Sequence, residues 1–127
     1  MKIKLMALTG IFALLFAGQP VFAADIDVRQ AAQLNQQGAL LLDVREVDEY
    51  AEFHAPNAML IPLGQLSERQ SELVKFKDKS IVVVCRSGRR SAQAVHFLQQ
   101  EGFTHVSNVN GGMMAWEQAG LAVMRKH

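Results

Sequence analysis

The sequence predicts an α/β fold with a central parallel sheet of about five strands and helices on both faces. Short runs that are almost entirely apolar recur along the chain, as expected of strands that are covered on both sides. Segments with the helical spacing of apolar residues alternate with these runs, and this alternation is typical of parallel sheets. The chain of 127 residues has no repeat and no Pro/Gly-rich linker after its first segment, so we expect one folded domain.

The first segment is typical of a signal peptide. Lys2 and Lys4 precede an uncharged, mostly apolar stretch over residues 5–17. That stretch is shorter than the roughly 17–25 residues that a membrane-spanning helix needs. The sequence that ends at Ala23 has small residues at the positions that signal peptidase reads. We therefore predict cleavage after Ala23.

This prediction divides the chain into a signal peptide over residues 1–23 and a mature domain over residues 24–127, exported to the periplasm or to another compartment outside the cytoplasm. An uncleaved membrane anchor is the alternative, but Gly18 and Pro20 would disrupt its helix, and we expect no stable membrane association after cleavage. The thirteen Lys and Arg include two in the signal peptide, so the mature domain keeps eleven against twelve Asp and Glu. This balance argues against a nucleic-acid partner.

The mature domain begins with a helix, a strand and a second helix. Asp27 is a suitable cap for a helix over Val28–Gln37, which Gly38 ends. The apolar run Ala39–Asp43 predicts a buried strand, and Arg45–Phe53 predicts a short acidic helix. A brief strand, a helix and the most apolar strand follow; they are predicted over Ala58–Ile61, Leu63–Val74 and Ser80–Val84.

The last third of the chain repeats this alternation. A helix is predicted over Ser91–Gln100, where apolar residues share one face, and Gly102 closes it. Thr104–Val109 predicts a strand, and Met113–Ala119 predicts a short final helix. The order supports the same parallel sheet.

Cys85 is the only cysteine, so it cannot form a disulfide within the chain. Such a thiol is either buried and inert or kept for chemistry. Cys85 directly follows the strand Ser80–Val84, and ligands of parallel sheets bind beyond the carboxyl ends of the strands. Its position therefore favours chemistry.

The residues after Cys85 form a short loop into the helix that begins near Ser91. Such a loop directs unpaired backbone N–H groups at one point, and Gly88 permits the positive φ that a tight anion-binding turn requires. Three guanidinium groups add fixed positive charge. They belong to Arg86, Arg89 and Arg90.

The loop could act on the thiol or on its reaction partner. Lowering the thiol pKa by about two units would raise the thiolate fraction at pH 7 about 25-fold. However, the nucleophilicity of a thiolate falls with its pKa, and this loss cancels roughly eightfold of that gain. We infer that the loop mainly binds an anionic donor and stabilises an anionic covalent intermediate.

Four motifs in this order resemble those of a single-domain rhodanese, and together they cover essentially the whole mature domain. In chain order they are the segments 41–45 with 49–50, the segments 54–58 with 61–63, the loop from Cys85, and the segments 110–116 with 119–121. The resemblance implies a rhodanese-like fold. It also implies a thiosulfate sulfurtransferase.

In that family, the residue that matches Cys85 is the nucleophile, which takes sulfane sulfur from a donor such as thiosulfate and holds it as a persulfide. The resemblance implies that a thiophilic acceptor, either cyanide or a thiol that can belong to a protein, then receives the sulfur without any metal or organic cofactor. The backbone N–H groups of the loop would hold the terminal sulfur, and its arginines would attract the anionic donor. The predicted substrate-binding residues are Arg86, Ser87, Gly88, Arg89, Arg90 and Ser91.

The chain departs from the family pattern where Phe53 and Asn57 replace two glycines. We expect the turn to survive because asparagine tolerates left-handed backbone. Structural roles are the simpler interpretation for an ion pair between Asp43 and Arg45 and for a hydrogen-bonded His54. We likewise expect Trp116 to anchor the core. We interpret the other three histidines, which lack metal-ligand spacing, as surface or boundary residues: His96, His105 and His127.

Two other functions remain open. Phosphatases and arsenate reductases also use a cysteine in an anion-binding loop, but they place arginine six positions later, where this chain has Ser91. A non-enzymatic persulfide carrier, or a module that docks on one partner protein, would need the same loop as the enzyme.

Overall fold

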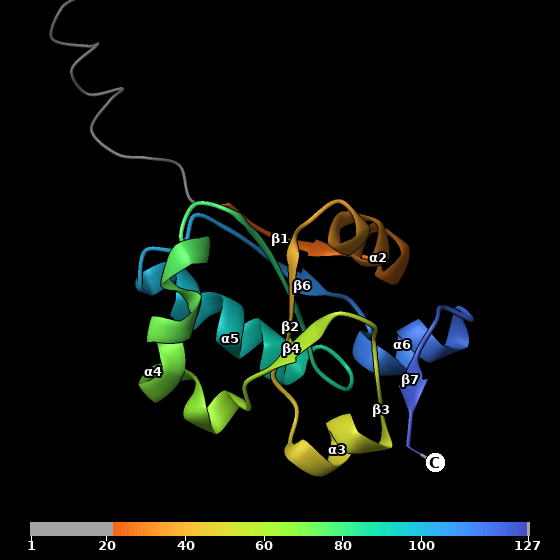
Figure 1. Ribbon diagram of the computed structural model, residues 1–127. Helices are drawn as coiled ribbons and strands as arrows, with labels where there is room; N and C mark the ends of the chain where they lie inside the picture. Colours follow the sequence, from red (N-terminus) through yellow and green to blue (C-terminus); the bar gives the residue numbers. More distant parts are fainter. Residues whose placement is uncertain (1–21, 127) are drawn as a thin grey trace, which may run out of the picture.

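The computed structural model describes residues 22–126 and has a five-stranded sheet at its centre (Figure 1). The strands lie in the order β1-β6-β5-β2-β4, and each neighbouring pair is parallel. The predicted α/β fold with about five parallel strands is therefore confirmed. The strands are β1 (Phe22–Ile26), β2 (Leu40–Asp43), β4 (Ala58–Leu60), β5 (Ser80–Val84) and β6 (His105–Val109).

Helices cover the two faces of this sheet (Figure 1). A small antiparallel sheet, made of β3 (Phe53–His54) and β7 (Met124–Arg125), lies beside it. The helical segments are α2 (Val28–Gln36), α3 (Val47–Glu52), η1 (Leu63–Gln65), α4 (Leu66–Arg69), η2 (Gln70–Phe76), α5 (Arg89–Gln100) and α6 (Gly112–Gln118), where η marks a 3-10 helix.

Successive residues of the central strands point to opposite faces of the sheet and feed two separate cores. Leu42 of β2 belongs to the cluster that includes Leu98 of α5. The preceding residue, Leu41, belongs to the cluster that includes Ala31 of α2 and Trp116 of α6. All five side chains are at most 3% exposed, so both faces of the sheet are buried, and the expected core position of Trp116 is confirmed.

The helices predicted between residues 45 and 74 differ from the observed ones. The helix expected over Arg45–Phe53 begins only at Val47, because Glu46 is extended and acts as its N-cap. The helix expected over Leu63–Val74 is divided into η1, α4 and η2. The apolar pattern located both segments, but it does not distinguish an α-helix from 3-10 turns.

Strand β1 has no counterpart among the predicted strands, because its first two residues, Phe22 and Ala23, belong to the predicted signal peptide. Residues 1–21 lie outside the described residues, so the signal peptide stays a prediction. A cut after Ala23 would leave Ala24–Ile26 paired with β6. Within the described part of the chain, no helix has the length and apolar character needed to cross a membrane.

Asn57 is the one residue other than glycine with positive φ in the described range, at 64°. It lies in the turn before β4, where the family pattern has glycine. The expectation that asparagine would take left-handed backbone here is confirmed.

Candidate active site

The carboxyl ends of β2 and β5 bring Asp43 and Cys85 to the same edge of the sheet. Asp43 is in register with Val84, the last residue of β5, and Cys85 follows directly. Since neighbouring parallel strands end at one edge, residues 42 positions apart in sequence become neighbours in space.

The loop after β5 closes around the Cys85 sulfur. Gly88 has φ 110° and serves as the N-cap of α5, so the helix begins at Arg89, two residues before the predicted start at Ser91. The Gly88 N–H lies 3.1 Å from Cys85 Sγ, and the Ser91 hydroxyl lies 3.3 Å from the same atom. The thiol therefore faces donors from the loop and from the first turn of α5.

Opposing effects act on the pKa of Cys85. Burial raises it, because Cys85 is 1% exposed and a thiolate loses hydration there. Hydrogen bonds from the Ser91 hydroxyl and from the backbone N–H groups of Ser91, Gly88 and Ser87 lower it. The donors outweigh burial, and the net result is a pKa below the ordinary value.

Helix α6 fixes the other side of the loop. The Met113 N–H donates to the Cys85 carbonyl at 2.8 Å, and the Met114 N–H donates to the Arg86 carbonyl at 3.0 Å. These two N–H groups belong to the first turn of α6, where no partner exists within the helix. The start of one helix thus holds the backbone that leads into another.

Gly112 makes this close approach feasible. A Cβ at this position would lie 2.4 Å from the Cys85 carbonyl oxygen and 2.5 Å from the Arg86 carbonyl group. Its φ of 57° also favours glycine. Any larger residue would push α6 away from the loop.

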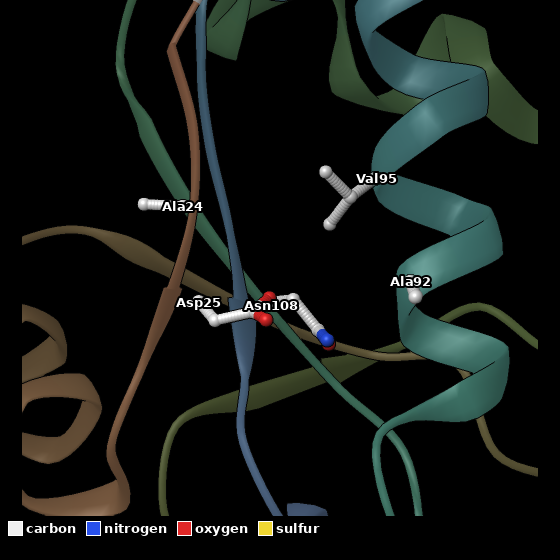
Figure 2. Close-up of a pocket in the computed structure, with 5 residues that line it drawn as sticks. All are labelled: Ala24, Asp25, Ala92, Val95 and Asn108. Atoms are coloured by element: carbon white, nitrogen blue, oxygen red, sulfur yellow. The ribbon is translucent and has the colours of Figure 1, made fainter.

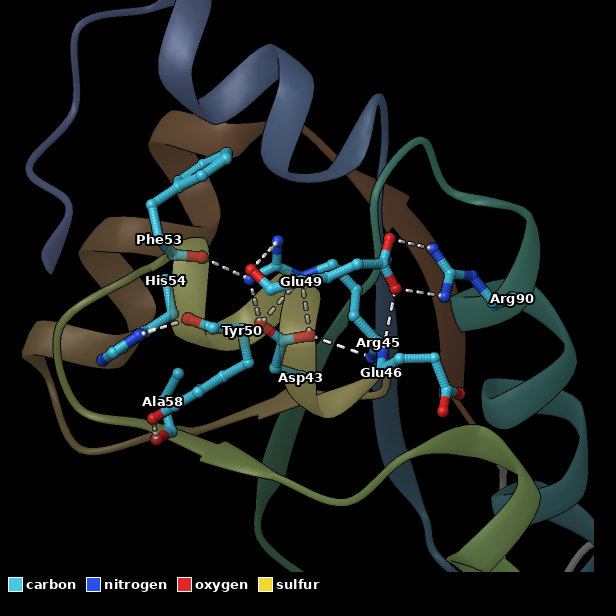
Figure 3. A network of polar contacts seen from close by, with 9 residues as sticks. All are labelled: Asp43, Arg45, Glu46, Glu49, Tyr50, Phe53, His54, Ala58 and Arg90. Atoms are coloured by element: carbon cyan, nitrogen blue, oxygen red, sulfur yellow. Dashed lines mark hydrogen bonds and ion pairs between the residues drawn. The ribbon is translucent and has the colours of Figure 1, made fainter. Parts of the chain in front are cut away.

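The predicted loop arginines have different environments. Arg86 and Arg89 are exposed, as is Ser87. Arg90 is half-buried and forms a bidentate ion pair with Glu49 of α3, with Nη–Oε distances of 2.7 and 2.9 Å (Figure 3). The donor-binding role of Arg90 stays a prediction, and its guanidinium already has a carboxylate partner.

A second arginine, Arg45, connects the end of β2 to α3 and to Phe53. Arg45 donates through Nε and Nη2 to the Asp43 carboxylate, with a shortest contact of 2.8 Å, and both side chains are at most 3% exposed (Figure 3). Its remaining N–H groups reach the carbonyls of Phe53 and Glu49. The predicted ion pair is confirmed.

His54 also has the expected structural setting. Its Nδ1 lies 2.8 Å from the Tyr50 carbonyl, and its ring stacks on the Tyr50 ring with centroids 3.8 Å apart. The Tyr50 hydroxyl donates to Ala58, which joins α3 to the start of β4. The side chain of His54 thus supports the turn region.

Arg86, the residue after Cys85, borders two open pockets. One, of about 320 Å³, is lined mainly by α3 and includes Asp48 and Glu52. The other, of about 160 Å³, lies towards α6 and includes Met114. Phe53 and Arg45 line both pockets, which therefore combine charged and apolar surface.

Metal ligands do not gather near this site. Within residues 22–126 there is no group of three or more His, Cys, Asp or Glu side chains placed to hold an ion. The donors around Cys85 are N–H and O–H groups, which suit an anion.

The family model described as a rhodanese-like domain matches residues 27–119. The chain belongs to this family. The rhodanese-like domain seen here is 36% identical over 102 residues to a sulfurtransferase from Allochromatium vinosum, which covers 79% of this chain and 94% of the relative. It is 35% identical over 110 residues to the thiosulfate sulfurtransferase PspE of Escherichia coli, which covers 87% of this chain and 88% of the relative.

A solved structure has the same fold. The rhodanese-related protein from Thermoplasma volcanium superposes with a TM-score of 0.72 at 35% identity, covering 80% of this chain and 97% of that chain. Together, the family and the names of the relatives support sulfur transfer as the chemistry of this rhodanese-like domain.

The sequence did not reveal three members of the site. Glu49 was recognised only as part of a family motif, and its pairing with Arg90 spans 41 positions. Asn108 of β6 contacts Ser91, and Gly112 packs on the loop. Gly112 was likewise recognised only as part of the motif 110–116; its glycine pair with Gly111 was a further signal, because glycine can mark close backbone approach.

Replacing Gly112 with alanine should disrupt the site. We expect Gly112→Ala to lower the free energy of unfolding by about 3 kcal/mol or more, because backbone must move to admit the Cβ. Gly120→Ala is the matched control, since Gly120 also has positive φ but has no atom within 4 Å of the added Cβ. The control should lose only about 1 kcal/mol. Equal losses in urea unfolding would contradict the crowding described here.

Removing the charge of Glu49 should reduce stability in a pH-dependent way. The side-chain hydrogen bonds from Arg90 lower the pKa of Glu49 from 4.5 to about 2. A carboxyl with a lowered pKa stabilises the folded state above pH 4.5, and this stabilisation is lost as the pH falls towards 2. We expect Glu49→Gln to cost about 1–3 kcal/mol at pH 7 and progressively less below pH 4.5.

Urea unfolding of the wild-type protein and of Glu49→Gln at several pH values measures this difference in stability. Glu72→Gln is the control, because Glu72 pairs with Arg69 on an exposed surface and should change stability little. A cost for Glu49→Gln that is constant from pH 7 to pH 3 would contradict an ionic role.

Proposed function

We propose that this rhodanese-like domain is a thiosulfate sulfurtransferase that works through a persulfide on Cys85. The observation that carries the proposal is the convergence of N–H and O–H donors on Cys85 Sγ at the start of α5. Donors in this arrangement stabilise negative charge on sulfur, whether on the thiolate or on a terminal persulfide sulfur. The names of the relatives agree with this chemistry.

The reaction has two displacement steps. The Cys85 thiolate attacks the outer sulfur of thiosulfate, a new S–S bond forms, and the old S–S bond breaks as sulfite leaves with the electron pair. An acceptor such as cyanide then attacks the terminal sulfur and leaves as thiocyanate, which restores the thiolate. Neither step needs an external oxidant or reductant.

The loop residues divide the work in this proposal. The backbone N–H groups from Arg86 to Ser91 hold the terminal sulfur of the loaded form. The exposed side chains of Arg86 and Arg89 attract the anionic donor, because their charge persists at any physiological pH. Arg90 contributes positive charge beside the sulfur while Glu49 fixes its position.

The sulfurtransferase proposal is tested by replacing the Cys85 thiol with a hydroxyl. Purified wild-type protein should convert thiosulfate and cyanide to thiocyanate, and Cys85→Ser should lower this rate by at least about 10³-fold while the chain still unfolds cooperatively. Mass spectrometry should find one additional sulfur atom on Cys85 after incubation with thiosulfate. Arg86→Ala and Arg89→Ala should raise the KM for thiosulfate, whereas Arg29→Ala on α2 should not.

Other outcomes identify the competing functions. Negligible thiocyanate production with a stable added sulfur on Cys85 would favour a persulfide carrier or a docking module. Turnover of an aryl phosphate that Cys85→Ser abolishes would favour a phosphatase. A wild-type protein that neither gains sulfur nor forms thiocyanate would overturn the proposal.

We also propose that the domain works after export, with residues 1–23 removed. The positively charged start, the short apolar stretch and the small residues up to Ala23 support this. Expression of the whole chain in a bacterium should place the protein in the periplasmic fraction, with Ala24 as the first residue by mass. A cytoplasmic protein of full mass would contradict export.

A further inference from the structure

Asn108 is a buried amide of β6 that lies behind the Cys85 loop. Its residue is 7% exposed, and it lines a pocket of about 250 Å³ between β1, β6 and α5. Figure 2 shows its side chain extending from β6 towards the helix that bears Ala92. The Nδ2 atom lies 3.3 Å from the Gly88 carbonyl oxygen, and Oδ1 contacts the Ser91 hydroxyl. Asn108 therefore contacts two of the residues that donate to the sulfur, Gly88 and Ser91.

These contacts fix the orientation of the amide. A carbonyl oxygen only accepts hydrogen bonds, so the NH₂ group of Asn108 must face Gly88. The Oδ1 atom then faces Ser91 and can only accept. Consequently only the Ser91 hydroxyl can be the donor of a hydrogen bond in this contact.

The Ser91 hydroxyl thus has two acceptors and one proton. Its Oγ lies 3.3 Å from Cys85 Sγ and within hydrogen-bond distance of Asn108 Oδ1. When Cys85 is a thiolate, the proton is best placed on the sulfur side, because a charged acceptor binds it more strongly. When Cys85 is a neutral thiol, Oδ1 is the better acceptor.

We propose that Asn108 is a positioning residue that competes with the Cys85 sulfur for the Ser91 hydroxyl proton and so holds the thiol form in balance with the thiolate. The significance of this balance for sulfur transfer rests on the proposed function. In the persulfide the charge has moved to the terminal sulfur, so the hydroxyl proton is free to return to Asn108. The amide thereby favours both uncharged states of Sγ, the thiol and the loaded form.

Several charged groups near the sulfur also affect the balance between thiol and thiolate, and they are the same in every Asn108 variant. Arg90 interacts electrostatically with Cys85 from α5, and Arg86 lies next to it in the loop. From β2, Asp43 reaches the same edge with its partner Arg45. Asp25 of β1 is in register with Asn108 and lines the same pocket.

Arg89 begins α5 and is exposed. Substitutions at Asn108 leave all of these groups in place. The effects of the uncharged Leu and Ala variants therefore isolate the amide.

The test measures the ionisation of Cys85 by its rate of alkylation with iodoacetamide at a series of pH values. Because Cys85 is the single cysteine, the signal belongs to one group. Asn108→Leu removes the acceptor and excludes water, and it should lower the midpoint by about 0.5–1 pH unit. Asn108→Asp keeps the shape, replaces the amide by a negatively charged acceptor, and should raise the midpoint.

The Ser91→Ala background separates this mechanism from general damage. There the hydroxyl is absent, so adding Asn108→Leu should leave the midpoint unchanged. If the leucine chain does not unfold cooperatively, Asn108→Ala replaces it with the same expectation. Shifts in the same direction for Leu and Asp, an unchanged midpoint in the single Leu variant, or a Leu shift that persists without the hydroxyl would each overturn the proposal.

The alkylation measurement does not depend on sulfur transfer. A wild-type protein without thiocyanate production would argue against the proposed function and leave the titration intact. Conversely, normal thiocyanate production together with a Cys85 midpoint that does not change in the Asn108 variants would refute only the role of the amide.

Discussion

The site depends on a buried sulfur that is surrounded by hydrogen-bond donors. Burial alone disfavours a thiolate, since charge loses the stabilisation that water gives it. The N–H groups of the loop and the Ser91 hydroxyl replace that water, and they succeed because Gly88 turns the backbone sharply enough to aim them at one atom. Without this turn, Cys85 would be an ordinary core residue at the end of a strand.

The turn is held from outside by α6. The first N–H groups of that helix bind the carbonyls of Cys85 and Arg86, and Gly112 lets the two backbones meet. The last motif of the sequence therefore completes a site that begins 27 positions earlier, at Cys85. The family's closing motif has a structural reason in this chain, because it supplies donors to the loop's own carbonyl groups.

The arginines around the Cys85 loop differ in whether they already have a carboxylate partner. Arg45 is committed to Asp43, and Arg90 is committed to Glu49. Glu49 meets both arginines, one through its carbonyl and one through its carboxylate, so α3 is tied to β2 and to α5. In the proposed function, the exposed Arg86 and Arg89 are the loop side chains that meet a small anion.

The sequence by itself determined the fold class, the central strands and the position of Cys85 at the carboxyl end of β5. It did so because apolar runs and glycine positions are local signals, and the order of the motifs added the family. Only the tertiary structure decided that β1 completes the sheet, that Arg90 pairs with Glu49 and that the Ser91 hydroxyl contacts Asn108. Those contacts join residues 17 to 83 positions apart in the chain, and no local pattern encodes such partners. They exist because parallel strands bring distant segments to one edge, where each buried polar group must find a donor or an acceptor.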